Sequence, residues 1–306
     1  METRHGTHLR LVTGAKGAEV GPLASAAPAR SATASKPIDG VSASLRALRH
    51  HWPEYAMEAF GLGLFMLSAC VFGAILDYPG SPVHHAIPDA TLRRVLFGAA
   101  MALTNIGNIY SPWGKRSGAH LNPAVSWTFF RLGKVERADA IFYTLSQFGG
   151  GVLGVFVARL FLRPLIAHPA VNYVATAPGA AGVGIAFVAE AAITFVLMSV
   201  ILTASNSARL SRYTGILASL LVMIYISVEA PLSGMSMNPA RTLGSAVFAG
   251  TWTALWVYFV APPLGMLLAA EVYLRLNGAR QVFCAKLHHH NNARCIFRCR
   301  FMELGN

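Results

Sequence analysis

Six long apolar segments alternate with polar connections along this chain. They fall near residues 55–76, 92–110, 139–161, 183–204, 213–230 and 252–274. Each segment is bounded by polar residues, Pro or Gly. Each is close to the length of about 20 residues that a helix needs to cross a hydrocarbon layer of about 30 Å. The pattern therefore predicts six membrane-spanning helices.

Two further apolar stretches are too short to span a membrane. Residues 124–132 lie in the connection 111–138, and residues 246–249 lie in the connection 231–251. Short apolar helices at matching positions in two halves of a membrane protein are typical of re-entrant segments, which are tolerated where they line a cavity. The predicted fold class is an all-α membrane protein with six transmembrane helices and two re-entrant half-helices.

The composition agrees with a protein whose main partner is the lipid bilayer. Hydrophobic residues make up 54% of the 306 residues and charged residues 12%, and the mean hydropathy is +0.48. Soluble proteins carry about 25% charged residues. The net charge of +12 could indicate nucleic acid binding, but that function needs basic residues clustered on a folded face with stacking aromatics. Here they lie between the apolar segments and in both tails, so we expect no nucleic acid partner.

The basic residues also predict an orientation. Most of the 25 Lys and Arg residues lie in residues 1–52, in the connection 111–137, at Arg209 and Arg212, and in the tail from Arg275. Six crossings put both termini on one side, and the positive-inside rule makes that side cytoplasmic. We therefore expect a multi-pass protein of the plasma (inner) membrane with both termini in the cytoplasm.

One motif occurs in both halves of the chain. Residues 117–124 read Ser-Gly-Ala-His-Leu-Asn-Pro-Ala, and residues 233–240 read Ser-Gly-Met-Ser-Met-Asn-Pro-Ala, followed by Arg241. Each motif is preceded by an acidic residue near the start of an apolar segment, Glu58 in the first half and Glu190 in the second. Because the two re-entrant segments enter from opposite sides, the halves form an inverted-topology repeat.

The Asn-Pro-Ala motifs are favourable helix starts. Asn is a preferred N-cap, and Pro fits the first helical turn. Two such starts that meet at mid-membrane direct two positive dipole ends at one point, which repels a cation but not a neutral hydrogen-bonding solute. The residues of the two starts are Asn122, Pro123, Ala124, Asn238, Pro239 and Ala240.

On both motifs, and over about residues 53–275, the sequence resembles the aquaporin (major intrinsic protein) family, as a bacterial-like member. The resemblance implies an aquaporin-like inverted repeat around one pore, a homotetramer, and a passive channel that is no enzyme and requires no cofactor. It implies that Glu58 and Glu190 accept hydrogen bonds from the re-entrant backbone and that Arg241 stands at the narrowest constriction. We expect His120 to brace its loop rather than bind a metal.

The resemblance divides the chain into three parts. Residues 1–52 are expected to be a disordered basic cytoplasmic leader. Residues 53–275 form the channel domain, with repeats at about 53–161 and 183–275. Residues 276–306 form a basic cytoplasmic tail that is rich in Cys and His.

The other constriction positions follow from counting along the chain. Ile226 and Met235 take the fifth-helix and loop positions. Phe97 takes the second-helix position if about five extra residues precede the first motif around residues 111–115, whereas Ala102 takes it without that insertion. The loop residues Pro and Gly in this stretch favour Phe97.

The predicted ring consists of Phe97, Ile226, Met235 and Arg241. These residues alone do not determine which solute passes. Water-selective members of the family usually have His where Ile226 stands, which favours a less selective pore. Glycerol facilitators usually have Asp directly after the Arg, whereas Thr242 stands here, and this favours water. We expect a water channel that excludes ions and protons, with a glycerol or mixed small neutral solute facilitator as the alternative.

Two other function classes fit the pattern less well. An ion-coupled secondary transporter also uses inverted repeats and broken helices, but the spanning segments hold few charged groups that could couple transport to an ion. A non-conducting scaffold would not need the intact Asn122, Asn238 and Arg241.

The tail contains candidate metal ligands. Three cysteines and neighbouring histidines can form a tetrahedral zinc site, and the residues considered are Cys284, His288, His290, Cys295 and Cys299. The alternative is a solvated basic tail at the lipid surface, where Lys and Arg residues contact anionic headgroups.

Overall fold

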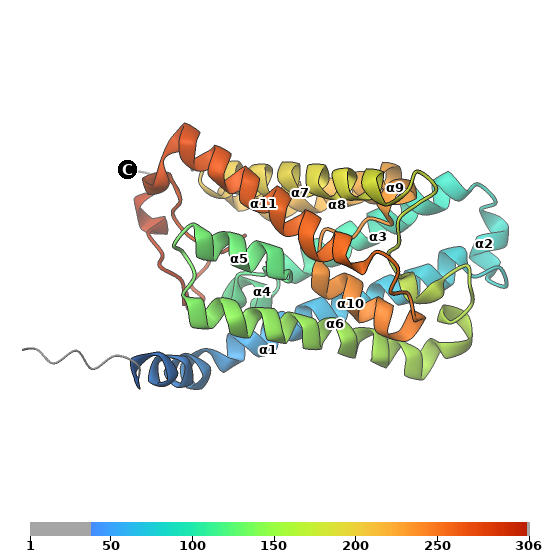
Figure 1. Ribbon diagram of the computed structural model, residues 1–306, viewed down its shortest axis with the longest axis horizontal. Coiled ribbons are helices and arrows are strands. Elements are labelled where there is room, and N and C mark those ends of the chain that lie inside the picture. Colours follow the sequence, from blue (N-terminus) through green and yellow to red (C-terminus); the bar gives the residue numbers. More distant parts are fainter. Residues whose placement is uncertain (1–37, 305–306) are drawn as a thin grey trace, which may run out of the picture. The chain divides into compact units, whose positions relative to one another are not determined.

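The computed structural model describes residues 38–304, and within that range every regular element is a helix (Figure 1). The six long helices are α1 (Ile38–Asp77), α3 (Ala90–Tyr110), α6 (Arg137–Ile166), α7 (Val183–Ser205), α8 (Thr214–Val228) and α11 (Leu255–Asn277). Two shorter helices, α5 (Pro123–Arg131) and α10 (Pro239–Ala249), begin at the Asn-Pro-Ala motifs. The predicted fold class is confirmed.

The remaining elements are short. They are α2 (Pro82–Ala86), α4 (Pro112–Ser117), α9 (Ala230–Ser233) and the 3₁₀ turns η1 (Asn172–Val174), η2 (Ser211–Tyr213), η3 (Ala279–Gln281) and η4 (Phe301–Glu303). The turn α4 lies where the sequence predicts extra residues before the first motif. Its N-cap is Ser111, whose hydroxyl accepts a hydrogen bond from the N–H of Gly114 (2.9 Å).

The helix α1 begins earlier than predicted. Residues 38–52, which the sequence assigns to a disordered leader, form its first turns, so that prediction is wrong for this stretch. The apolar pattern begins only after Pro53, which lies inside the helix and removes one backbone hydrogen bond. Residues 42–52 are mostly exposed, so they continue the helix without contributing to the core. The leader prediction for residues 1–37 lies outside the described residues.

Five helices in the described range are long and apolar enough to cross a membrane, namely α1, α6, α7, α8 together with η2, and α11. The sixth long helix, α3, carries polar residues that bond to its neighbours. Asn105 Nδ2 donates to Ser219 Oγ of α8 (3.0 Å), and Asn108 Nδ2 donates to the carbonyl oxygen of Gly61 in α1 (3.0 Å). The amide groups of Asn105 and Asn108 therefore form interhelical hydrogen bonds inside the bundle, as polar side chains in membrane helices do.

Contacts of the half-helices connect the two repeats. The half-helix α5 packs against α6 of its own repeat and against α11 of the other repeat. The half-helix α10 packs against α11 of its own repeat and against α6 of the other. In addition, α3 packs along α8, and α7 packs along α11. The two repeats therefore interlock at their half-helices.

The helix α6 approaches α1 closely at two glycines. A Cβ atom added at Gly150 would lie 2.1 Å from the carbonyl oxygen of Ala59, and one added at Gly154 would lie 2.2 Å from that of Gly63. Any side chain at these positions would overlap the backbone of α1. Small residues that let backbones approach are typical of helix packing in membranes.

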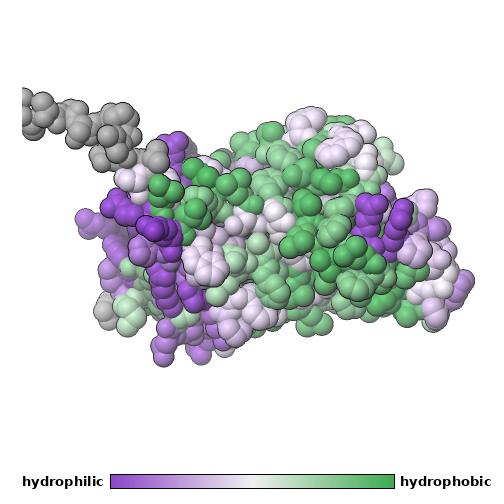
Figure 2. Space-filling view, turned by 90° about the horizontal axis from the view of Figure 1, so that it is seen from below, coloured by the Kyte–Doolittle hydropathy of each residue, from purple (hydrophilic) through white to green (hydrophobic). Residues whose placement is uncertain are grey.

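The outer faces of the long helices expose large apolar side chains, among them Leu103, Leu145, Phe161, Val188 and Leu268. Figure 2 shows a broad hydrophobic band between hydrophilic ends on the face in view. Soluble monomers rarely expose contiguous apolar patches of more than a few hundred Å². The surface is that of an integral membrane protein.

After α11 the tail folds back against one end of the bundle, here called the tail end (Figure 1). Three hydrogen bonds from its backbone N–H groups attach it to the interhelical connections. Phe283 N–H donates to Asn206 Oδ1 (2.8 Å), Leu287 N–H to the carbonyl oxygen of Gly118 (3.1 Å), and Arg298 N–H to that of Lys134 (3.0 Å). The tail is therefore a packed part of the structure.

Gly150→Ala is expected to destabilise the bundle, because the added methyl group would overlap the backbone of α1. Overpacking of this kind costs about 1–3 kcal/mol, which should lower the midpoint of thermal unfolding in detergent. Gly149→Ala is the matched control, since a Cβ atom there meets no atom within 4 Å. Equal midpoints for the two variants would contradict the close packing of α1 and α6.

Candidate functional site

Asn122 and Asn238 cap the two half-helices. The Oδ1 atom of Asn122 accepts a hydrogen bond from the N–H of Ala124 (2.9 Å), and that of Asn238 accepts one from Ala240 (3.0 Å). Both asparagines have extended backbones, and a proline follows each as the first helical residue. The local structure is the N-cap that the motif favours.

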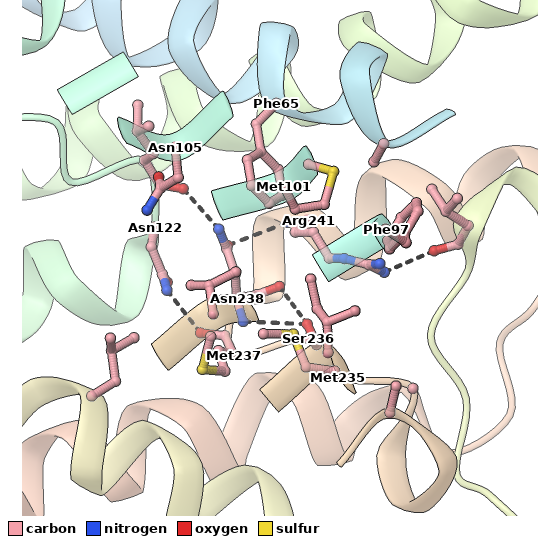
Figure 3. A pocket seen from close by; sticks show the side chains of 18 of the residues that line it. Phe65, Phe97, Met101, Asn105, Asn122, Met235, Ser236, Met237, Asn238 and Arg241 are labelled. Carbon is pink, nitrogen blue, oxygen red and sulfur yellow. Dashed lines mark hydrogen bonds between the residues drawn. The ribbon is translucent and has the colours of Figure 1, made fainter. Parts of the chain in front are cut away.

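The amide groups of the two asparagines tie the half-helices together. Asn122 Nδ2 donates to the carbonyl oxygen of Met237 (2.7 Å), and Asn238 Nδ2 donates to that of Leu121 (2.7 Å) (Figure 3). An amide group carries two N–H donors, so each asparagine keeps one N–H beyond this bond. The two helix starts lie next to each other, and both direct a positive dipole end toward the same region.

The carboxylate of Glu58, in α1, accepts hydrogen bonds from the loop that precedes α5. Its Oε1 atom accepts from Ser117 Oγ (2.7 Å) and from the N–H of His120 (3.1 Å). Its Oε2 atom accepts from the N–H of Leu121 (2.6 Å) and from Gln147 Nε2 (2.8 Å). The loop N–H groups are therefore satisfied in a fully buried position that water does not reach.

The carboxylate of Glu190, in α7, bonds to the second loop in the same way. Its Oε1 atom accepts from Ser233 Oγ (2.7 Å) and from the N–H of Ser236 (2.7 Å), and its Oε2 atom accepts from the N–H of Met237 (2.7 Å). These donors stand at the motif positions that Glu58 binds in the first loop. Both acids therefore accept hydrogen bonds from the re-entrant backbone, as the resemblance implies.

The two loops also share an unusual backbone. Ala119 and Leu121 in the first loop, and Met235 and Met237 in the second, have φ angles of 50–56°. A non-glycine residue in this left-handed region costs about 1–3 kcal/mol and persists only where its surroundings hold it. The N–H groups of Leu121 and Met237 donate to the two carboxylates, and those of Ala119 and Met235 donate to the hydroxyls of Ser117 and Ser233 (3.1 and 3.0 Å), which supplies that restraint.

A tyrosine fixes the start of each loop. Tyr143 OH donates to the carbonyl oxygen of Ser117 (2.6 Å), and Tyr258 OH donates to that of Ser233 (2.5 Å). Both tyrosines are fully buried. In each loop, a carboxylate therefore accepts hydrogen bonds from backbone N–H groups, and a tyrosine hydroxyl donates one to a backbone carbonyl oxygen.

His120 connects its loop to α5 and to the tail. Its Nδ1 atom lies 3.0 Å from Ser126 Oγ, and its Nε2 atom lies 2.9 Å from the carbonyl oxygen of Ala285. The ring is stacked on Phe129 and on Phe297, each at 5.3 Å between centroids. These contacts suit the bracing role expected for His120.

One cavity of about 520 Å³ runs past both asparagines. Its lining includes Asp77 and Arg94, near the end where α1 stops and α3 begins. It also includes Asn122 and Asn238, and Leu287 of the tail. The cavity therefore extends along the bundle from the α2 side to the tail end.

All four residues predicted to form the constriction line this cavity, namely Phe97, Ile226, Met235 and Arg241. Figure 3 shows three of them near Asn238. Ala102, the alternative to Phe97, is not among the described residues that line the cavity. The structure therefore places Phe97 at the cavity.

A backbone carbonyl holds Arg241 at the cavity. Arg241 Nη1 donates to the carbonyl oxygen of Val174 (2.8 Å). Residues 172–174 all have positive φ angles, and the following Thr176 places its Oγ1 atom 2.9 Å from Thr242 Oγ1. The sequence analysis does not predict this loop as part of the site, because its contribution is a carbonyl group that any residue type could supply.

The tail brings together three cysteines and one histidine. The sulfur atoms of Cys284, Cys295 and Cys299 and a ring nitrogen of His289 all lie within 4.8 Å of one another. This arrangement brings together the three predicted cysteines but uses a different histidine.

The histidines predicted as ligands lie elsewhere. The ring of His288 packs against that of Tyr110 at 4.6 Å, and His290 Nε2 lies 2.8 Å from Ser211 Oγ. His289 therefore faces the cysteines, while His288 and His290 contact residues at the end of α3 and in η2. The prediction of His288 and His290 as ligands is therefore wrong.

Comparisons with known proteins agree with this geometry. A family model described as major intrinsic protein matches residues 44–273. The chain is 35% identical over 181 residues to the glycerol uptake facilitator protein-like 6 of Lactiplantibacillus plantarum, a match that covers 56% of this chain and 81% of that relative. It is 34% identical over 161 residues to aquaporin NIP1-3 of Oryza sativa subsp. japonica. That match covers 52% of this chain and 54% of the relative, so the chain matches about half of the relative's length.

A solved structure shares the fold. The aquaglyceroporin from Plasmodium falciparum superposes with a TM-score of 0.60 at 21% identity, over 73% of this chain and 95% of that chain. At this identity the likeness concerns the fold alone.

Glu190→Gln is expected to destabilise the second loop, because an amide NH₂ group replaces one of the two acceptor oxygens. A buried N–H left without a partner costs about 1–3 kcal/mol, which should lower the thermal midpoint in detergent. Glu271→Gln is the control, since Glu271 pairs with Arg131 at the surface (2.6 Å) and exposed pairs contribute about 0–1 kcal/mol. If the midpoint of Glu190→Gln is no lower than that of the control, Glu190 does not stabilise the second loop.

Proposed function

Because the chain belongs to the major intrinsic protein family, whose members are passive channels and not enzymes, we propose that it forms a transmembrane pore for water. The observation that carries the proposal is that Asn122, Asn238 and Arg241 line a single cavity. No ion gradient and no cofactor are needed for such a pore.

The two helix starts provide the selectivity against ions. Each asparagine holds the opposite loop with one N–H and offers its second N–H to a passing oxygen atom. The positive ends of α5 and α10 repel a cation at this point, and they do not repel a neutral solute. Hydronium is excluded for the same reason.

The predicted constriction adds a second barrier. Arg241 is the charged member of the ring, and its guanidinium group supplies hydrogen-bond donors while it repels cations. Phe97, Ile226 and Met235 offer apolar walls. A solute that passes must exchange its water partners for a few fixed polar groups, which a small neutral molecule can do.

A second candidate function is the passage of glycerol or other small neutral solutes together with water. The specific observation that favours it is Ile226 in the cavity lining, where water-selective members of the family usually carry a histidine. An apolar wall of three residues opposite one arginine suits a molecule with a carbon backbone on one side and hydroxyl groups on the other.

We also propose that the tail end faces the cytoplasm of a plasma (inner) membrane. Basic residues in the connections at this end support it, namely Lys115, Arg116, Arg131, Lys134, Arg137, Arg209 and Arg212. The opposite connections hold fewer, which agrees with the positive-inside rule.

The exposed apolar faces fit lipid and neighbouring copies, and we propose the homotetramer that is general in the family.

Stopped-flow light scattering on liposomes that contain the full-length protein tests the proposal. Osmotic gradients of impermeant sugar, glycerol and urea would be applied, with a pH-sensitive dye inside. We expect fast water flux, slow glycerol and urea flux, and no pH change. Glycerol flux comparable to water flux would favour the second candidate, and water flux no faster than in protein-free liposomes would contradict both.

Arg241→Ala is expected to raise glycerol flux and to admit protons, because the substitution widens the pore and removes a positive charge from it. The readouts are the glycerol swelling rate and the signal of the internal dye. Arg131→Ala removes an arginine from the bundle surface and serves as the control. Unchanged selectivity in Arg241→Ala would exclude Arg241 from the filter.

Ile226→His is expected to lower the ratio of glycerol to water flux severalfold, because it replaces an apolar contact with a polar ring. Ile226→Leu keeps an apolar side chain of equal size and should leave the ratio unchanged. If the two variants show the same ratio, position 226 does not contribute to the choice of solute.

A further inference from the structure

The tail contains a cluster of side chains that the pore does not use. The Sγ atoms of Cys284 and Cys295 are 3.6 Å apart, and Cys299 Sγ lies 3.1 Å from His289 Nε2. All four potential ligand atoms lie within 4.8 Å of one another. The side chains converge from both ends of the segment 284–299.

These distances fit a tetrahedral zinc site. Zn–S bonds of about 2.3 Å and a Zn–N bond of about 2.0 Å hold two sulfur atoms roughly 3.8 Å apart and a sulfur and a nitrogen roughly 3.5 Å apart. The Cys284–Cys295 separation of 3.6 Å and the Cys299–His289 separation of 3.1 Å are close to these values, and no separation in the cluster exceeds 4.8 Å. Three cysteines with one histidine also form a closed ligand set that is common in structural zinc sites.

The surroundings hold the ligands in place. The side chain of Cys284 is 4% exposed and belongs to the hydrophobic core. The N–H of Phe301 donates to Cys299 Sγ (3.4 Å), and the His289 ring is stacked on the Phe301 ring at 4.4 Å. Outer contacts of this kind orient the ligands of metal sites.

The charge of the tail also suits a zinc–thiolate centre. Three thiolates and one Zn²⁺ ion carry one net negative charge. Lys286 is buried, and its Nζ atom donates to the carbonyl oxygens of Ala293 and Arg294 (3.1 and 2.8 Å). The side chain of Lys286 therefore lies inside the loop that the cluster closes.

The tail needs a source of stability other than regular secondary structure. Residues 282–300 form neither helix nor strand, yet Val282 and Ala285 are fully buried. A segment that gains few backbone hydrogen bonds of its own cannot readily offset the entropy lost on folding. A structural metal supplies folding free energy directly.

From these observations we infer that Cys284, His289, Cys295 and Cys299 bind one zinc ion, which fastens the tail across the tail end of the pore. The zinc closes the loop 284–299, and this loop bonds to the pore-forming connections through Leu287 and Arg298. Leu287 also lines the cavity and is 5% exposed. The ion thus holds an apolar side chain at this end of the cavity, whichever solute passes.

The first test is the zinc content of the purified full-length protein, measured by plasma mass spectrometry after gel filtration in metal-free buffer. We expect about one zinc per chain, and a content in Cys295→Ser and Cys299→Ser below roughly a tenth of that, because each loses a ligand. Cys70→Ser and His290→Ala are the matched controls and should retain zinc. Wild-type protein without zinc, or with a Cys284–Cys295 disulfide, would overturn the inference, as would cysteine variants that retain the metal.

A second measurement avoids variants that fail to fold. The wild-type protein would be loaded with Co²⁺ in place of zinc, and its absorption spectrum should show thiolate-to-cobalt charge transfer and the intense visible bands of tetrahedral cobalt. A spectrum of octahedral cobalt without charge transfer would contradict the ligand set.

The fastening of the tail is tested by limited trypsin digestion of the protein in detergent. The zinc-loaded protein should be cleaved slowly at Lys286 and Arg294, and a chelator should accelerate cleavage at these sites but not in the helical bundle. Equal cleavage rates with and without zinc would mean that the ion does not hold the tail. Neither readout depends on transport, so failure here would leave the proposed channel function untouched.

Discussion

A backbone that turns back inside a membrane has no water to satisfy its N–H groups. Glu58 and Glu190 meet this constraint from the first helix of each repeat, where each carboxylate accepts hydrogen bonds from a serine hydroxyl and two backbone N–H groups of a loop. The left-handed residues of both loops persist because these bonds hold them. The two acids therefore fix the loops from which the half-helices begin, together with the asparagine amides and the two tyrosines.

The same constraint determines the polarity of the pore. Since the carboxylates occupy the N–H side of each loop, the asparagine amides and Arg241 are left as donors toward the cavity. Side chains from the long helices, among them Phe97 and Ile226, complete an apolar wall. In the proposed channel, a neutral solute passes between these donors and the apolar wall, whereas two positive helix ends and an arginine repel a cation.

Much of this site could be predicted from the sequence, because a charged or capping residue inside an apolar segment is costly enough to indicate a function. Glu58, Glu190 and Arg241 were recognisable on that ground, and the order of the long helices was recognisable from hydropathy. Other parts depend on the folded path of the chain. Val174 contributes only a carbonyl oxygen, and the choice of His289 among three adjacent histidines follows from contacts between the tail and connections far away in sequence. The helical start of α1 before Pro53 carries no apolar pattern, so hydropathy could not predict it.

The most direct test of the central claim, that the two facing helix starts exclude cations, is the cation permeability of the double variant Asn122→Asp with Asn238→Asp. Asp keeps an N-cap oxygen for each half-helix but replaces both amide donors with negatively charged oxygens. Liposomes with the internal pH dye would be compared with wild-type liposomes after equal folding is verified by circular dichroism. The account predicts a proton or sodium leak in the variant and none in the wild type. A variant as impermeable to cations as the wild type, with unchanged water flux, would contradict it.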